Sequence, residues 1–181
     1  MDPKFTIQYG EFAVAERLKK DIKGASVFIP ASQQEKGIDL LLYKFDNGRN
    51  KTITVQVKMS RGYRERLKKY PYQLWFGRFD IHENADWYIL VGIYAKHSTK
   101  TEARVTDTSW DEIMLAFTNE EMKRFMSEVK QKKDPSKDDK FFYFGFDEKK
   151  NVFQTRGYPE ERDMSAFLIE KRLADIEKSF K

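Results

Sequence analysis

Alternating hydrophobic and polar residues predict a two-stranded hairpin in the first third of the chain. The apolar runs at residues 38–45 and 53–57 flank the turn-forming residues Asp46, Asn47 and Gly48. This combination is typical of two antiparallel strands joined by a tight turn. In the second run the odd-numbered positions are apolar and the even-numbered ones polar. Side chains alternate between the faces of a strand, so one face is expected in the core and the other carries polar groups.

The remaining apolar spacing predicts helices and strands along the rest of the chain. Residues 5–22 have helical spacing, and the face expected to meet the core consists of Phe12, Ala15, Leu18 and Ile22. Residues 87–94 are apolar on both faces, which is typical of a central strand in a mixed or parallel sheet. The other expected elements are strands at 25–30, 72–79 and 102–106, helices at 110–117 and 119–130, an aromatic hairpin at 141–155 and a helix at 160–180. We therefore expect an α/β protein with a mixed central β-sheet flanked by helices.

The composition narrows the class of protein. A length of 181 residues suits a single domain, and 15% aromatic residues suit the filling of one core. The chain has no cysteine, which excludes disulfides, thiolate zinc sites and cysteine nucleophiles. It contains no apolar run that could span a bilayer and no signal-peptide segment, so we expect a cytoplasmic protein without a membrane partner. A glycine-rich nucleotide loop is also absent, so ATP use is not expected.

One acidic residue in the predicted hairpin points to chemistry. Asp39 lies within an apolar run, where an unpaired buried carboxylate is costly. Lys58 on the neighbouring strand, or a metal ion, could compensate its charge. A divalent cation with oxygen ligands suits an Asp together with the amide oxygen of Gln56. A lysine beside that ion could orient or deprotonate an attacking water, which is the chemistry of phosphodiester hydrolysis.

These residues resemble the metal site of the PD-(D/E)xK nuclease superfamily, which has the restriction-endonuclease-like fold. The resemblance covers residues 9–62 and includes a preceding helix that carries Glu11. It implies that Asp39, Gln56 and Glu11 bind Mg²⁺, or alternatively Mn²⁺, while Lys58 positions the water. The length of the chain indicates one domain over 1–181. A nuclease-like core would occupy about 5–106, and a C-terminal helix and hairpin extension about 107–181.

Two positions depart from the family pattern. Gly37 and Ile38 stand where many members have a proline before the aspartate. Gln56 stands where most members have an acid, which removes one negative charge and should weaken metal binding. Some members with glutamine at this position are active, so catalysis remains the expectation.

A cluster of basic residues follows the predicted site. The whole chain has a net charge of +5 and a calculated isoelectric point near 9.2. The segment from Lys58 to Tyr70 contains six cations and one acid, Glu65. Basic residues beside a nuclease site can bind phosphates. The residues expected to contact DNA are Arg61, Arg64, Arg66, Lys68 and Lys69.

The function predicted from these residues is a Mg²⁺-dependent DNA endonuclease. An alternative is a non-catalytic nucleic-acid-binding or assembly module on the same fold, which the neutral Gln56 would suit. A branch-specific nuclease similar to junction resolvases is a second alternative, and an unrelated hydrolase using Lys58 and Ser60 a third. A homodimer is one arrangement that would cut both strands of a duplex.

Overall fold

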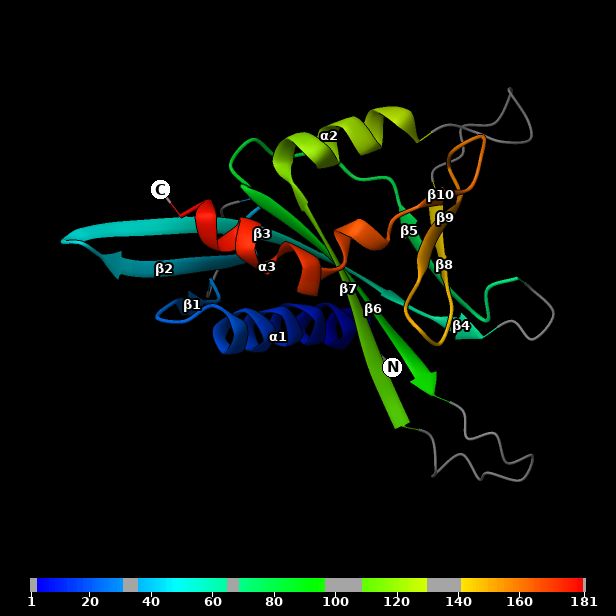
Figure 1. Ribbon diagram of the computed structural model, residues 1–181, viewed down its shortest axis with the longest axis horizontal. Coiled ribbons are helices and arrows are strands. Elements are labelled where there is room, and N and C mark those ends of the chain that lie inside the picture. Colours follow the sequence, from blue (N-terminus) through cyan, green and yellow to red (C-terminus); the bar gives the residue numbers. More distant parts are fainter. Residues whose placement is uncertain (1–2, 31–35, 65–68, 97–108, 130–140, 181) are drawn as a thin grey trace.

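The computed structural model describes residues 3–30, 36–64, 69–96, 109–129 and 141–180. The chain is an α/β protein in which a mixed five-stranded sheet packs against a second five-stranded sheet (Figure 1). The first sheet has the order β1-β2-β3-β6-β7. Its strands are β1 Ser26–Phe28, β2 Leu40–Asp46, β3 Arg49–Arg61, β6 Trp87–Lys96 and β7 Ser109–Thr118.

The second sheet is antiparallel and has the order β10-β9-β8-β5-β4. Its strands are β4 Tyr63–Arg64, β5 Tyr72–Gly77, β8 Phe141–Phe146, β9 Val152–Arg156 and β10 Arg162–Asp163. The helices are α1 Pro3–Asp21, α2 Asn119–Glu128 and α3 Ile169–Lys178, with a short 3₁₀ helix at Ser165–Phe167. None of the described helices is long and apolar enough to cross a membrane.

The predicted hairpin is confirmed by β2 and β3. Asp46 pairs with Arg49, which leaves Asn47 and Gly48 as a two-residue loop. Their φ angles of 51° and 74° are those required by the tight hairpin turn that asparagine followed by glycine favours. The predicted central strand at 87–94 is also confirmed, because β6 pairs in parallel with β3 and antiparallel with β7.

The predicted apolar face of the first helix is partly wrong. Val14, Leu18 and Ile22 are almost completely buried, whereas Phe12 is 61% exposed. Residues four apart lie on one row of a helix, while Phe12 and Val14 differ by about 200° around its axis. The sheet covers the row that contains Val14, so Phe12 points toward solvent.

The helix predicted at 110–117 is wrong, since these residues belong to β7. β7 pairs with β6 along its whole length, from Trp87 with Thr118 to Lys96 with Ser109. Tertiary pairing overrides the weak helical signal, because side chains on both faces of the strand become buried in cores. The next prediction is confirmed, as Thr118 caps α2 in a reciprocal capping box with Glu121.

The C-terminal predictions are confirmed in part. The aromatic hairpin is present as β8 and β9. The helix predicted at 160–180 is shorter than expected, because β10 and the 3₁₀ helix take up its first part before α3 begins at Ile169. The strand predicted at 102–106 lies outside the described residues.

Two hydrophobic cores cover the two faces of the first sheet. α1 and α3 pack on one face around Val55, Ile89 and Ile176. The second sheet and α2 pack on the other face around Leu90 and Phe144. Gly92 on β6 makes the close approach of the sheets feasible, because a Cβ atom there would lie 2.4 Å from both δ carbons of Leu74 on β5.

Candidate active site

The start of β2 holds Asp39 beside the middle of β3. The backbone N–H of Asp39 donates to the carbonyl of Val55 over 2.9 Å. Its Oδ2 accepts a hydrogen bond of 2.7 Å from the backbone N–H of Val57. These bonds go to the residues on either side of Gln56, so the carboxylate is fixed next to that residue.

Gln56 has an unsatisfied oxygen in this position. The side chain is only 4% exposed, and its Oε1 has no hydrogen-bond partner among the residues that the structure describes. A buried acceptor without a partner costs roughly 1–3 kcal/mol. A bound cation that is not part of the polypeptide would offset this cost by binding the oxygen.

Glu11 lies on α1, and its ionisation is affected by the other charged residues of the site. Partial burial and the Asp39 carboxylate raise the pKa of Glu11 above its ordinary value, while the Lys58 ammonium opposes the shift. The three side chains are therefore close enough to interact electrostatically. Their combined charge is −1 when both carboxylates are ionised, which leaves a place for additional positive charge.

Lys58 lies on the same face of β3 as Gln56, two residues further along. Its ammonium lies 5.4 Å from the centroid of the Phe79 ring. Phe79 stacks on Tyr88 at 5.9 Å, and the Tyr88 hydroxyl accepts a bond of 2.7 Å from the His82 N–H. The lysine is thus supported by an ordered aromatic stack.

Sequence reasoning missed the contributions of Phe79 and Tyr88. Tyr88 is the neighbour of Gln56 in the parallel pairing of β3 and β6. The apolar pattern identified its strand as central, but the strand order was needed to place it beside Gln56. Phe79 follows β5 in the second sheet, and no local pattern links that segment to Lys58.

The residues of the site fit a hard divalent cation. The two carboxylates and the unpartnered amide oxygen are donors of the kind that Mg²⁺ prefers, and waters usually complete its shell. Within the described ranges there is no group of three or more His, Asp or Glu side chains that could hold a metal ion. Among the described residues, the Gln56 amide oxygen is the further donor that we consider beside Asp39 and Glu11.

The predicted basic cluster is divided between two places. Arg61 is exposed at the end of β3 and lies over the ring of Trp110 at 5.1 Å. Lys69 is also exposed, but its ammonium pairs at 2.6 Å with Glu161, which directly precedes β10 of the second sheet. Arg64 belongs to β4, whereas Arg66 and Lys68 lie outside the described residues.

Two further polar residues near the site accept hydrogen bonds that join neighbouring strands. Asp86 Oδ2 accepts bonds from the Thr54 N–H at 2.9 Å and the Thr54 hydroxyl at 3.0 Å, which secures the start of β6 against β3. Ser60 is buried, and its hydroxyl accepts a bond of 3.3 Å from the Trp75 N–H. This bond joins β3 to β5.

Comparison with protein-family models, curated proteins and solved structures finds no match to this chain. Its function is therefore inferred from the residues and geometry of the site.

Proposed function

We propose that this protein is a Mg²⁺-dependent DNA endonuclease with a restriction-endonuclease-like core. The observation that carries the proposal is the buried Oε1 of Gln56, which has no hydrogen-bond partner among the described residues. Asp39 is hydrogen-bonded to the residues on either side of Gln56, and its carboxylate raises the pKa of Glu11. The order of elements supports it as well. A helix precedes an antiparallel β1-β2-β3 unit, and β3 then pairs in parallel with β6.

Each residue has a distinct role in this proposal. Asp39, Gln56 and Glu11 would hold the metal ion through their oxygens. When bound, Mg²⁺ neutralises charge on the scissile phosphate and makes water a stronger nucleophile. Lys58 donates to the attacking water and orients it toward phosphorus, and its charge also stabilises the phosphate as the bond to the leaving oxygen breaks.

The cation–π contact between Lys58 and Phe79 supports the role of the lysine in orienting water. A long, flexible side chain loses entropy when it is held in one place. The ring attracts the ammonium and reduces the number of positions that it occupies. The lysine is therefore positioned before substrate binds, as required for efficient orientation of water.

DNA would approach along the end of β3. Arg61 follows Lys58 by three residues and has an exposed guanidinium, so it can contact a phosphate next to the scissile one. Arg64, Arg66, Lys68 and Lys69 extend the positive charge in sequence. A homodimer would provide a second site for the opposite strand.

The test is cleavage of supercoiled plasmid, linear duplex and four-way junction DNA with Mg²⁺ or Mn²⁺. We expect metal-dependent cutting that falls by about 100-fold or more in Asp39→Ala and Lys58→Ala. Matched controls are Asp46→Ala and Lys51→Ala, since these residues form an ion pair of 3.2 Å at the other end of the same two strands. Both controls should cleave like the wild type.

Other outcomes identify the competing functions. Binding of DNA without cutting, unchanged by Asp39→Ala and Lys58→Ala, would indicate a non-catalytic binding module. The neutral Gln56 favours this as the second candidate. Cutting confined to the four-way junction would indicate a branch-specific nuclease.

A further inference from the structure

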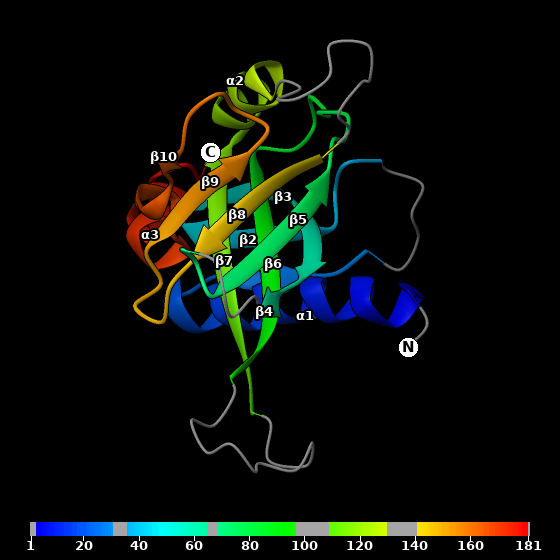
Figure 2. The ribbon, with the colours of Figure 1, turned by 90° about the vertical axis from the view of Figure 1, so that its right-hand side faces the viewer.

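The outer face of the second sheet carries aromatic rings that are not used by the candidate active site. Alternation buries Leu74, Phe142 and Phe144 against the first sheet, so their neighbours point outward. Trp75 is 40% exposed and Phe141 is 39% exposed. Figure 2 looks onto this face, and no labelled helix lies in front of β5, β8 and β9.

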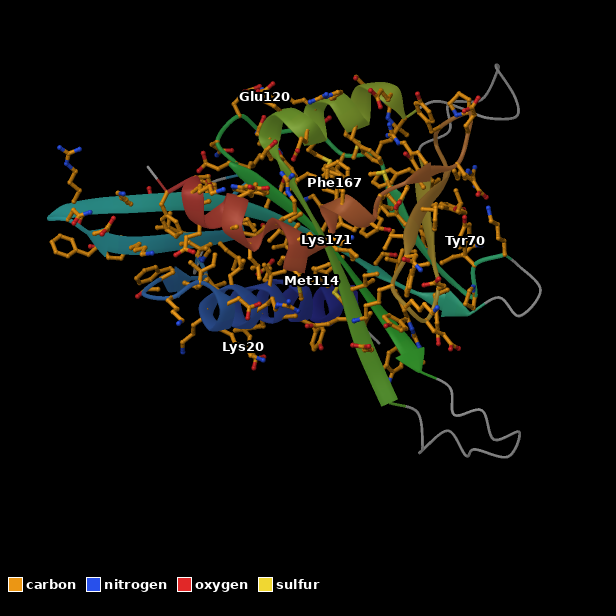
Figure 3. The ribbon with its side chains drawn as sticks, viewed as in Figure 1. Lys20, Tyr70, Met114, Glu120, Phe167 and Lys171 are labelled. Atoms are coloured by element: carbon orange, nitrogen blue, oxygen red, sulfur yellow. The ribbon has the colours of Figure 1, made fainter. Side chains whose placement is uncertain are left out.

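The outward rings lie on three neighbouring strands of the second sheet. Trp75 and Phe141 are in edge contact at 5.4 Å, and Trp75 is the direct cross-strand partner of Tyr143. Phe153 on β9 is half-buried, and the buried Tyr70 stacks on it at 5.0 Å. Figure 3 shows Tyr70 on the side of the molecule formed by this sheet. We call this layer the aromatic face, and its members are Trp75, Phe141, Tyr143 and Phe153.

Positive charge accompanies these rings. The guanidinium of Arg156 lies over Tyr143 at 4.8 Å, and the ammonium of Lys69 lies over Tyr70 at 5.1 Å. Glu161 pairs with Lys69 at 2.6 Å and also accepts a bond of 3.0 Å from the Tyr70 hydroxyl. The three described strands β5, β8 and β9 contain no acidic residue, and their one charged residue is Arg156. The face therefore suits a ligand that combines flat rings with negative charge.

The aromatic face adjoins the strand that carries the candidate site. The Trp75 N–H bonds to Ser60, which lies two residues beyond Lys58 on β3, a separation of ~7 Å along a strand. β4 pairs with Tyr72 and Gln73 only, so Trp75 lies at the edge of its sheet nearest β3. A nucleic-acid strand could pass from this edge to the site within a short length.

We propose that the aromatic face binds single-stranded DNA by base stacking. Bases inside a duplex already stack on one another, whereas unpaired bases can stack on exposed aromatic side chains while cations contact the phosphates. The inference rests on the proposed endonuclease function for its biological meaning. It specifies the substrate as DNA that has an unpaired segment next to the phosphate that is cut.

The binding test uses fluorescence anisotropy of labelled oligothymidine, with EDTA present so that cleavage cannot interfere. We expect Trp75→Ala and Phe141→Ala each to weaken binding by about 10-fold, and Trp75→Phe to retain most of it. The matched control is Phe45→Ala. Phe45 is 64% exposed but lies at the tip of the β2–β3 hairpin, at the opposite end of the molecule from the second sheet (Figure 1).

Several results would overturn the assignment. One is unchanged oligothymidine binding in both alanine variants. Another is blunt duplex that binds as tightly as oligothymidine and loses as much affinity in the variants. A third is tighter binding of oligouridine than of oligothymidine. A change in sedimentation mass caused by Trp75→Ala, without a change in oligothymidine affinity, would instead make the face a self-association surface. Circular dichroism of each variant verifies that it is folded.

A second measurement separates this inference from the proposed function. Asp39→Ala should abolish Mg²⁺-dependent cleavage of a forked duplex but bind oligothymidine like the wild type. Oligothymidine binding that depends on Trp75, without cleavage under any metal condition, would support the aromatic face and refute the endonuclease. Cleavage that is lost in Asp39→Ala, without detectable oligothymidine binding, would support the endonuclease and refute the aromatic face.

Discussion

The carboxylate of Asp39 accepts a 2.7 Å hydrogen bond from the backbone N–H of Val57, the residue between Gln56 and Lys58. This bond gives Asp39 a structural role as well as its proposed role as a metal ligand. The two roles predict different effects for two substitutions. Asp39→Asn keeps an acceptor for the Val57 N–H but removes the charge, whereas Asp39→Ala removes both.

We expect Asp39→Ala to lower the free energy of unfolding by about 1–3 kcal/mol, because the Val57 N–H loses its partner. Asp39→Asn should change this free energy by less, yet both variants should lose DNA cleavage. Urea denaturation combined with plasmid cleavage measures the two effects. Equal stability of the two variants would show that the bond to Val57 contributes nothing to folding.

Substitutions of Gln56 test whether its unpartnered oxygen is a ligand. Gln56→Leu should raise the metal-free unfolding free energy by about 1 kcal/mol, because it removes a buried acceptor without a partner. It should also abolish any stabilisation by Mg²⁺. A matched control is Gln154→Leu, since Gln154 is also buried but its Oε1 accepts a bond of 2.6 Å from Arg162. The control should destabilise the protein, and destabilisation by Gln56→Leu as well would contradict the prediction.

The reverse change, Gln56→Glu, should tighten Mg²⁺ binding and lower metal-free stability at neutral pH. A carboxylate with 4% exposure beside Asp39 is poorly hydrated and close to a like charge. Bound Mg²⁺ would offset both effects. Isothermal titration calorimetry and thermal unfolding with and without Mg²⁺ measure the change, and unaltered Mg²⁺ affinity would place the metal elsewhere.

Glu11 predicts a pH dependence of stability. Burial and Asp39 raise its pKa above the ordinary value of 4.5, so the folded state binds the proton more tightly than the unfolded state does. Stability from this group is therefore fully present below the ordinary value and is lost as the pH rises through the folded pKa. Glu11→Gln should unfold at a higher temperature than the wild type at pH near 7, and this advantage should disappear below pH 4.5. A pH series of metal-free thermal unfolding tests the prediction, and a constant difference across the series would refute it.

Phe79 is predicted to position Lys58. Phe79→Leu should lower kcat by roughly 3-fold, the effect of losing a weak cation–π contact, and leave KM unchanged. Phe79→Tyr retains an aromatic ring and should retain most of the activity. A fall in activity caused only by a higher KM would instead indicate that Phe79 contacts the substrate.

The approach of the two sheets predicts an overpacking effect at Gly92. Gly92→Ala would place a methyl group 2.4 Å from the δ carbons of the buried Leu74, which should cost about 1–3 kcal/mol of unfolding free energy. Shortening the opposing residue with Leu74→Ala should relieve the clash. The double variant should therefore be more stable than the sum of the two single effects predicts, as measured by urea denaturation.

Local sequence determined the elements whose signals act between neighbouring residues. Asn47 and Gly48 can adopt the positive φ angles of a two-residue hairpin loop. The polar and apolar alternation near Gln56 assigned the two faces of β3. The Thr118 capping box marked the start of α2. The acidic, amide and basic residues proposed for the site were also recognisable, because their types and spacing are visible in the chain.

Only the tertiary structure decided which distant segments meet. Residues 110–117 became a strand because pairing with β6 buries them in cores on both faces. Phe12 became exposed because the sheet covers the row of α1 that contains Val14. The ring that supports Lys58 comes from the segment after β5, and an aromatic layer on the second sheet points outward. Such relationships depend on strand order and sheet packing, which join residues far apart in the chain and leave no periodic signal in it.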